Sequence, residues 1–371
     1  MRYVLFYHSL VSDWNHGNAH FLRGVMRELL SRGHEVTLYE PRDGWSRTNL
    51  LEREGAGAVR AFSRAFPELT SELYDEDLDL GEAIDGADVV IAHEWNEPGL
   101  IAELGAQRRK RPSVRLLFHD THHRSVSAPD QMRRYDLSGY DGVLAFGEVI
   151  RELYLKNGWA RDAWTWHEAA DVEHYRPLPG VRRSADLVWI GNWGDGERTE
   201  ELERFVFEPV RRLGLRATAR GVNYPADAAA RLARSGVRYG GWASALDVVR
   251  EYARHRATVH VPRRFYAREL PGIPTIRVFE ALACGIPLVC SPWEDAEGLF
   301  APGDDFLIAR DGEEMVEMLE WIVTEPREAR AMARRGRETT LRRHTCAHRV
   351  DELESVLSEL GAPGAAVEAA S

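Results

Sequence analysis

Short apolar runs alternate with segments of helical length along almost the whole chain, and this alternation constrains the fold more than any other feature. Strands separated by helix-length connections pair in parallel, because the chain must cross back over the sheet between them. The pattern therefore predicts an α/β protein with helices on both faces of a parallel sheet. In the first half of the chain the expected strands are Tyr3–Tyr7, His34–Tyr39, Asp88–Ala92, Val114–Phe118 and Gly142–Phe146.

The same alternation starts again after Pro177-Leu178-Pro179-Gly180, the strongest linker signal in the chain. The expected strands there are Asp186–Ile190, Leu215–Ala219, Val237–Tyr239, Ala257–Val261 and Pro287–Cys290. The sequence thus predicts two Rossmann-like, doubly wound domains that face each other across a cleft, over residues 1–176 and 177–345. We expect a helix over 346–360 to pack back on the first domain, and the small-residue tail 361–371 to be disordered.

Composition limits the classes of partner. The 371 residues carry 48 basic and 59 acidic side chains, a net charge of −11, which argues against nucleic acid as the main partner. Lys110 and Lys156 are the only lysines, so a phosphate site must be built from arginines and backbone amides. Three cysteines without a CxxC pair fit a reducing compartment.

The N-terminal apolar run is too short for a signal peptide, and no run approaches the length of a membrane span. We therefore expect a cytoplasmic protein. The basic run Arg108–Arg111 allows at most peripheral membrane contact, and a solvated turn is its ordinary interpretation.

The most informative segment is Pro271–Val289. It predicts a helix over Thr275–Cys284, with Pro274 in the first turn and Gly285 just after the end. The free N–H groups at such a helix start, contributed around Gly272, Ile273 and Thr275, would form an anion site.

Arg277 and Glu280 are three residues apart on that helix and share one face. Arg277 would add a bidentate phosphate donor, and Glu280 could accept two sugar hydroxyls one turn deeper. The alternative interpretation is an ordinary amphipathic helix on which the two side chains pair with each other at the surface.

The run Arg277-Val278-Phe279-Glu280-Ala281-Leu282-Ala283-Cys284-Gly285-Ile286-Pro287 resembles the donor-site helix of GT-B glycosyltransferases of the group 1 type, and more closely that of the CgeB-like (spore-coat-type) enzymes. The resemblance extends over much of the second half, including Val188–Trp193, Pro302–Leu307 and His344–Arg349, and over Trp166–Asp171 before it. It implies a GT-B fold, a nucleotide-sugar donor on the second domain, an acceptor on the first, and a ribose held by Glu280.

One departure from that family limits what the resemblance implies. Many group 1 enzymes carry a second glutamate eight positions earlier, where this chain has Gly272, and the nearest acid is Glu269. The identity of the donor sugar and the stereochemical outcome therefore stay open.

Two further segments fit a diphosphate-sugar site. Gly191–Arg198 follows an expected strand, where its glycines could free backbone amides and Asn192 and Arg198 could meet the donor. Arg263 and Arg264 follow the next expected strand at its carboxyl end and could neutralise the leaving diphosphate. A plain turn and a solvated basic loop are the alternatives for these two segments.

The first domain carries polar clusters at successive strand ends. Gly17 lies in the loop after the first strand, where it could meet donor phosphates or acceptor, or simply precede a helix cap. The cluster His119–Arg124 invites a metal interpretation, but its spacing is not that of a metal site, and we expect none. Asp120 and His122 are the candidates for a base that takes the proton of an acceptor hydroxyl, and a cleft-wall role is the alternative.

The sequence therefore predicts a hexosyltransferase-type enzyme that moves a sugar from a nucleoside diphosphate donor to a hydroxyl of a glycan, a protein or a small molecule. It would need neither cofactor nor metal, because arginines and a helix N-terminus stabilise the diphosphate. The alternatives are a GT-B-type nucleotide-sugar epimerase and a non-catalytic nucleotide-sugar binding protein. Interconversion of donor without acceptor would favour the first, and affinity without turnover would favour the second.

Overall fold

The computed structural model describes residues 1–194 and 196–361. The chain divides into two compact units: unit 1 comprises Met1–Glu168 and the C-terminal segment from Cys346, and unit 2 comprises Ala169–Thr345. The division lies at Ala169 rather than at the expected residue 177, because Ala170 forms a bridge with Thr345 and its N–H donates to the carbonyl of His344 (2.9 Å). The predicted disorder of the tail concerns residues 362–371, which lie outside the described residues.

Unit 1 is built on a parallel sheet that, in the described residues, has seven strands in the order β3-β2-β1-β4-β5-β6-β7. The strands are β1 (Arg2–Phe6), β2 (Glu35–Pro41), β3 (Glu72–Tyr74), β4 (Val89–His93), β5 (Arg115–Asp120), β6 (Gly142–Ala145) and β7 (Ala163–Thr165). Every residue of β4 and β6 is buried, as expected for strands covered on both faces.

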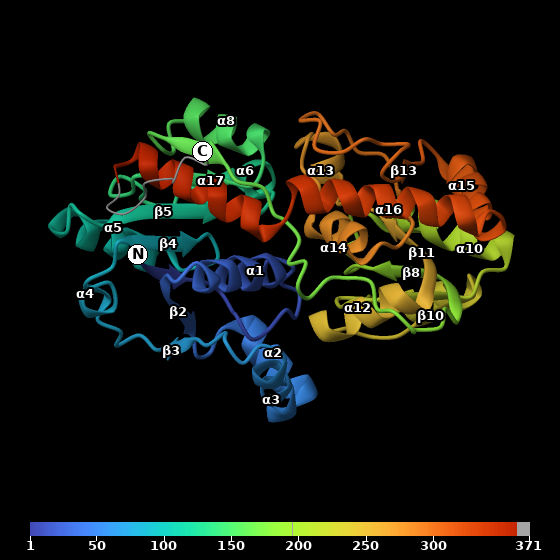
Figure 1. Ribbon diagram of the computed structural model, residues 1–371, viewed down its shortest axis with the longest axis horizontal. Coiled ribbons are helices and arrows are strands. Elements are labelled where there is room, and N and C mark those ends of the chain that lie inside the picture. The colour runs from blue at the N-terminus through green and yellow to red at the C-terminus, as the bar shows by residue number, and fades with distance from the viewer. Residues whose placement is uncertain (195, 362–371) are drawn as a thin grey trace. The chain divides into compact units, whose positions relative to one another are not determined.

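The helices of unit 1 are α1 (Asn18–Ser31), α2 (Trp45–Glu54), α3 (Ala56–Ala65), α4 (Leu80–Ala83), α5 (Pro98–Lys110), α6 (Arg124–Ser127), α7 (Pro129–Met132), α8 (Glu148–Lys156) and α17 (Cys346–Glu359). The C-terminal α17 packs against α1, and the two helices lie side by side in Figure 1. Arg32, the C-cap of α1, holds this contact through Glu354 (2.9 Å) and Asp351 (2.8 Å).

Unit 2 has a second parallel sheet, which in the described residues has six strands in the order β10-β9-β8-β11-β12-β13. The strands are β8 (Ala185–Ile190), β9 (Ala217–Arg220), β10 (Val237–Tyr239), β11 (His255–His260), β12 (Leu288–Cys290) and β13 (Leu307–Ile308). Two parallel doubly wound sheets confirm the predicted fold class of two Rossmann-like domains.

The helices of unit 2 are α9 (Thr199–Leu202), α10 (Glu208–Leu213), α11 (Ala228–Arg234), α12 (Ala245–Arg254), α13 (Arg264–Arg268), α14 (Ile276–Cys284), α15 (Gly312–Thr324) and α16 (Pro326–Arg343). A π-helical turn, η1 (Glu203–Phe207), joins α9 to α10, so the helical segment over 199–213 is not uniform.

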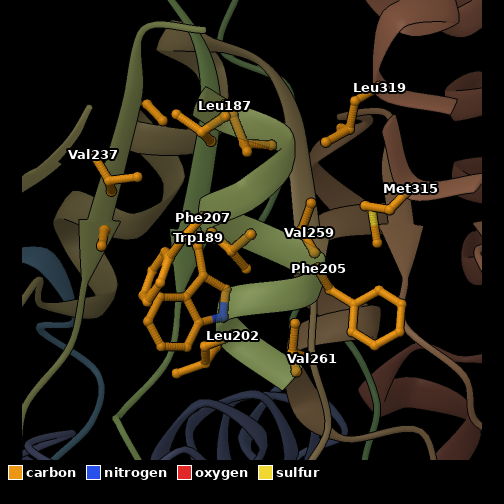
Figure 2. Packing of buried hydrophobic residues seen from close by; sticks show 14 of the residues in the cluster. Leu187, Trp189, Leu202, Phe205, Phe207, Val237, Val259, Val261, Met315 and Leu319 are labelled. Carbon is orange, nitrogen blue, oxygen red and sulfur yellow. The ribbon is translucent and has the colours of Figure 1, made fainter. Parts of the chain in front are cut away.

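Apolar side chains from the strands and the covering helices meet in the core of unit 2. Figure 2 shows Trp189 of β8 and Val259 of β11 among residues of η1 and α15, with Phe205 and Met315 close by. Close packing in this core fixes the positions of the strand ends, and the polar loops of unit 2 extend from these ends.

Cys284, Cys290 and Cys346 are buried, and none of the three forms a disulfide within the described residues. No helix within the described residues has the combination of length and hydropathy that a bilayer crossing requires.

Candidate functional site

Both sheets reverse their strand order beside their first strand, and this topology marks where a ligand can bind. In unit 2 the reversal lies between β8 and β11, and in unit 1 it lies between β1 and β4. Loops at the carboxyl ends of two such strands run in opposite directions and leave a crevice for ligands. The polar residues predicted from the sequence follow these strand ends in both units.

Arg198 joins the two loops at the reversal in unit 2. Its Nη1 donates to the carbonyl of Val261 after β11 (2.8 Å), and its Nη2 and Nε donate to the carbonyls of Asn192 and Trp193 after β8. The Asn192 side chain in turn accepts from the N–H of Val222 (2.9 Å). Burial lowers the pKa of Arg198 to about 10, so the guanidinium keeps its charge at neutral pH. Arg198 therefore fixes both loops and places a buried positive charge between them.

Arg263 and Arg264 follow β11 and are both held by acidic residues of the loop and helix after β8. Arg263 pairs with Glu197 (2.8 Å), and Arg264 pairs with Glu201 (2.7 Å) while its N–H donates to Glu197 (3.0 Å). Their charge is thus balanced within unit 2, and a diphosphate would have to compete with Glu197 to recruit them.

Helix α14 begins at Ile276 with Thr275 as its N-cap, so the prediction that Pro274 lies in the first turn was wrong. Gly272, beside Ile273, adopts a φ of +88°, and a Cβ on it would lie 3.0 Å from the side chain of Glu297. Only glycine fits this close approach without strain. The chain therefore enters α14 through a tight turn beside a carboxylate.

His260, the last residue of β11, reaches the start of α14. Its Nε2 lies 2.9 Å from the Thr275 hydroxyl. Burial, together with the smaller effects of the Arg198 and Arg277 charges, lowers the pKa of His260 to about 3. The imidazole is therefore neutral at neutral pH and adds no charge to this helix start, where the free N–H groups favour an anion.

Glu280 lies one turn into α14 and is 1% exposed, so it does not face bulk water. Its carboxylate pairs with Arg277 and accepts from the Tyr252 hydroxyl of α12 (3.4 Å). The predicted pairing on one helix face thus forms, but as a largely buried pair rather than a surface one. Burial alone would lower the pKa of Arg277, but the nearby carboxylate of Glu280 has the larger combined effect and raises it.

Gly285 ends α14 in the left-handed conformation, with a φ of +65°, as predicted. The helix is buried almost all round, so its position relative to β11 and α16 is fixed by packing.

In unit 1, the loop from Ser9 to Asp13 is held by two buried residues through main-chain atoms. Glu40 of β2 accepts from the N–H of Leu10 (2.6 Å), and Arg23 of α1 donates to the carbonyls of Leu10 (2.9 Å) and Val11 (3.0 Å). Gly17 follows as the N-cap of α1. The loop between β1 and α1 is therefore a rigid wall of this strand end.

Four imidazoles gather at the ends of β1, β4 and β5: His8, His16, His93 and His119, with ring centroids 5.1–6.2 Å apart between neighbours. Burial lowers the pKa of His8 to about 4 and that of His119 to about 3. The pKa values of His16 and His93 also lie well below the usual value, mainly because of burial. The cluster is uncharged at neutral pH.

The two candidate base residues lie at the end of β5 in different environments. Asp120 is fully buried, and its carboxylate accepts from the Tyr154 hydroxyl (2.8 Å) and the N–H of His122 (3.0 Å). Burial and the charge of Glu94 raise the pKa of Asp120 well above its usual value. The His122 ring is partly exposed and packs against Trp95. Of the two, His122 is the one that a solvent-side substrate can reach.

A buried ion pair supports this strand end. The Glu94 carboxylate accepts from Arg124 Nη2 (2.6 Å) and from the N–H of Thr121 (2.9 Å), and the Arg124 guanidinium lies 4.4 Å from the Trp95 ring. The described residues contain no group of three or more histidine, cysteine or acidic side chains placed to hold a metal ion.

Sequence reasoning missed His260, Tyr252 and Glu197 as parts of the unit 2 site. His260 ends a strand of the reversal, and its position at a strand end was the available signal. Tyr252 and Glu197 act through partners 28 and 66 residues away, which one sequence does not reveal.

Residues 198–355 match a protein-family model described as glycosyl transferase-like. The match begins at Arg198 and includes Arg263, Arg264, Arg277 and Glu280. No curated protein sequence matches the chain significantly.

Solved structures with the same fold include sucrose-phosphate synthase from Thermosynechococcus elongatus, with 14% identity, a TM-score of 0.65, and coverage of 98% of this chain and 99% of that one. Anabaena HepE, solved with UDP and glucose, has 14% identity and a TM-score of 0.68 over 96% of this chain and 99% of its own. An α-glucosyltransferase solved with UDP and a 13-mer DNA has the same identity, TM-score and coverage. The fold is thus that of GT-B glycosyltransferases, while the CgeB-like resemblance stays a prediction.

Proposed function

We propose that this protein is a glycosyltransferase that moves a sugar from a nucleoside diphosphate sugar to a hydroxyl acceptor. The observation that carries the proposal is the buried Arg277–Glu280 pair on α14, behind a positively charged helix start, inside the segment that matches the glycosyl transferase-like family. The nucleotide would bind unit 2 and the acceptor unit 1.

The charge distribution of unit 2 suits a departing diphosphate. The N–H groups at the start of α14 and the buried guanidinium of Arg198 supply fixed positive potential, which stabilises negative charge as it grows on the leaving group. Arg263 is available once a phosphate replaces Glu197 as its partner. Glu280 would accept ribose hydroxyls at the edge of its pair with Arg277.

We keep metal independence as part of the proposal, because the carboxylates of Glu197 and Glu280 are each paired with an arginine. A chelator should leave turnover unchanged. Loss of activity in EDTA that returns with Mg²⁺ would contradict this part of the proposal alone.

His122 is the better candidate for a base on the acceptor side if the reaction inverts the anomeric centre, because Asp120 is enclosed by Tyr154 and the backbone. The acceptor itself is proposed only as a hydroxyl of a glycan, a protein or a small molecule. The net charge of −11 argues against nucleic acid as the acceptor, although one protein of this fold was solved with DNA.

The test is a thermal-shift panel of nucleoside diphosphates and their sugars on the full chain, since a ligand of the native state raises its melting temperature. At least one nucleotide should protect at micromolar concentration, and a panel without any protecting nucleotide would refute the proposal. With the protecting donor, transfer to an acceptor distinguishes the enzyme from a binding protein, and donor interconversion without acceptor would identify an epimerase.

Glu280→Gln tests the ribose contact while preserving the volume of the side chain. Loss of a charged hydrogen bond should weaken nucleotide binding by about 1–3 kcal/mol. Glu269→Gln is the matched control, because Glu269 is exposed at the end of α13. Unchanged affinity in a folded Glu280→Gln variant would remove this residue from the site.

A further inference from the structure

Unit 2 contains a polar cavity of about 520 Å³ that shares no residue with the proposed donor site. Its charged and titratable lining residues are Arg216, Arg220, Arg238, Glu251, Arg254 and His255. Ala217 and Ala219 of β9 belong to the apolar core, so Thr218 and Arg220, which alternate with them, lie on the opposite face of the sheet. The cavity is on that face, beside α12 and near the first residues of β8, β9 and β11.

The cavity carries more positive charge than its acidic residues balance. Glu251 pairs with Arg220 (2.5 Å), and Arg216 pairs with Asp186 (3.2 Å). The Arg238 guanidinium donates to the Thr218 hydroxyl (3.2 Å) and forms no ion pair with the described residues. The exposed guanidinium of Arg254 has no hydrogen bond or ion pair within residues 1–194 and 196–361. Two guanidinium charges are therefore left for a ligand.

Two buried polar atoms of the lining also lack a partner among the described residues. His255 is 2% exposed, and its Nδ1 lies 2.6 Å from the carbonyl of Glu251. A carbonyl can only accept, so Nδ1 carries the proton of the neutral ring and Nε2 presents a bare lone pair, which has no donor. The Nε–H of Arg220 is buried without an acceptor. Such atoms are costly to leave unsatisfied, which favours a ligand that supplies both groups.

We propose that this cavity binds a phosphate group. Hydrogen phosphate, or a phosphate monoester in its singly ionised form, offers a P–OH that can donate to His255 Nε2 and anionic oxygens that can accept from Arg220 Nε. The remaining charge faces Arg238 and Arg254. Sulfate has the same shape and charge but no hydroxyl at neutral pH, so it satisfies the arginines and leaves the imidazole unsatisfied.

The neutral state of His255 fits this role. Burial lowers the pKa of His255, and the nearby charges of Arg238 and Arg220 lower it too, whereas the carbonyl and carboxylate of Glu251 raise it. At pH 7.5 the ring accepts a hydrogen bond, and a bound anion would raise its pKa. Phosphate should therefore be preferred over sulfate at pH 7.5, and the preference should shrink as the pH falls and the ring becomes able to donate.

The experiment is calorimetric titration of the full chain with inorganic phosphate and with sulfate at low ionic strength. We expect phosphate to bind at least 10-fold more tightly than sulfate at pH 7.5. Arg238→Gln and Arg254→Gln should each weaken phosphate binding about 10-fold, since both arginines are exposed and neither leaves a carboxylate unpaired. Arg234→Gln, an exposed arginine of α11 outside the cavity, is the charge-matched control and should change binding less than 2-fold.

Phosphate affinity that is equal in wild type and in the Arg238→Gln and Arg254→Gln variants would overturn the proposal, as would a lack of phosphate binding or equal binding of sulfate. Nucleotide protection should be unchanged in Arg254→Gln. Failure of the glycosyltransferase proposal would appear instead as a lack of nucleotide protection with phosphate binding intact, so the two are separable.

The source of the phosphate is distinguished by two further arms. Glucose 6-phosphate, titrated at about pH 6 so that its singly ionised form with a P–OH is present, tests a small phosphorylated sugar. Vesicles of phosphatidylcholine with phosphatidic acid test a lipid headgroup. If the phosphorylated sugar or the vesicles bind and binding depends on Arg254, the result supports the phosphate site and identifies the source of the phosphate. If neither binds and inorganic phosphate does not bind either, the proposal is rejected.

Discussion

Replacing Glu94 by alanine should destabilise unit 1 by about 3–5 kcal/mol, the cost of leaving one member of a buried ion pair without its partner. The carboxylate is fully buried and accepts from Arg124 through Nη2 (2.6 Å) and Nε (3.0 Å). It also accepts from the N–H of Thr121 (2.9 Å), which the substitution leaves without an acceptor. The guanidinium stays under Trp95 and cannot move freely into water.

Hydrogen–deuterium exchange is the appropriate assay, because a chain of two units need not unfold in one step. Amides of β4 and β5 should exchange roughly 100- to 4,000-fold faster in Glu94→Ala, since each 1.4 kcal/mol is tenfold. Amides of β8 and β11 serve as the internal reference. Arg133→Ala is the control variant, because its pair with Asp130 is exposed and should contribute less than about 1 kcal/mol.

The double variant Glu94→Leu with Arg124→Met should be less destabilised than Glu94→Ala, because it removes both charges together. A change below about 1 kcal/mol in Glu94→Ala would refute the reasoning, since it would mean that water solvates the remaining guanidinium.

Gly272→Ala should lower stability by about 1–3 kcal/mol, because Gly272 has a positive φ and the added methyl group would contact Glu297. Gly33→Ala should lower stability less, because Gly33 has a positive φ but faces open space. Differential scanning calorimetry compares the two variants. The stability of Asp120→Asn should rise relative to that of the wild type as the pH increases above 3.8, because a carboxyl with a raised pKa in the folded state stabilises the fold at low pH and loses this contribution on ionisation. Chemical denaturation at several pH values measures the difference in unfolding free energy between the two proteins. A difference that does not change with pH would contradict the prediction. The pKa of His260 is lowered to about 3, so the contribution of the neutral ring to stability is complete above pH 6.5 and is lost as the pH falls toward 3. His260→Gln should therefore reduce the loss of unfolding free energy between pH 6.5 and 3 in urea titrations. An unchanged pH dependence would show that the ring is already solvated.

The elements with strong local signals were predictable from the sequence. The helix that ends at Gly285 was found because its apolar spacing and its C-terminal glycine agree. The edge strands β3, β7 and β13 were missed because they have two or three residues that are mostly only partly buried and form no apolar run, whereas the equally short β12 is buried throughout and was predicted. The start of α14 was misplaced by the preference of proline for the first helical turn, whereas Pro274 here precedes the N-cap.

The candidate site was predictable in position but not in its pairings. Polar residues after parallel strands had to gather at the reversal of strand order, which places Asn192, Arg198 and Arg263 in unit 2. That Arg198 would bind carbonyls and Arg263 a glutamate 66 residues away depends on loop paths. The enclosure of Asp120 likewise depends on Tyr154 from α8, a tertiary contact with no local signature.

Glu40 and Arg23 hold the loop between β1 and α1 through the peptide groups of Leu10 and Val11, and also through the side chains of Ser9 and Asp13. Exchange of the side chain of Val11, which contributes its carbonyl to the contact with Arg23, would leave those peptide contacts in place. This part of unit 1 can therefore change its chemical surface through point substitutions without losing its shape, which makes it a suitable place to diversify by directed evolution when a new acceptor is sought.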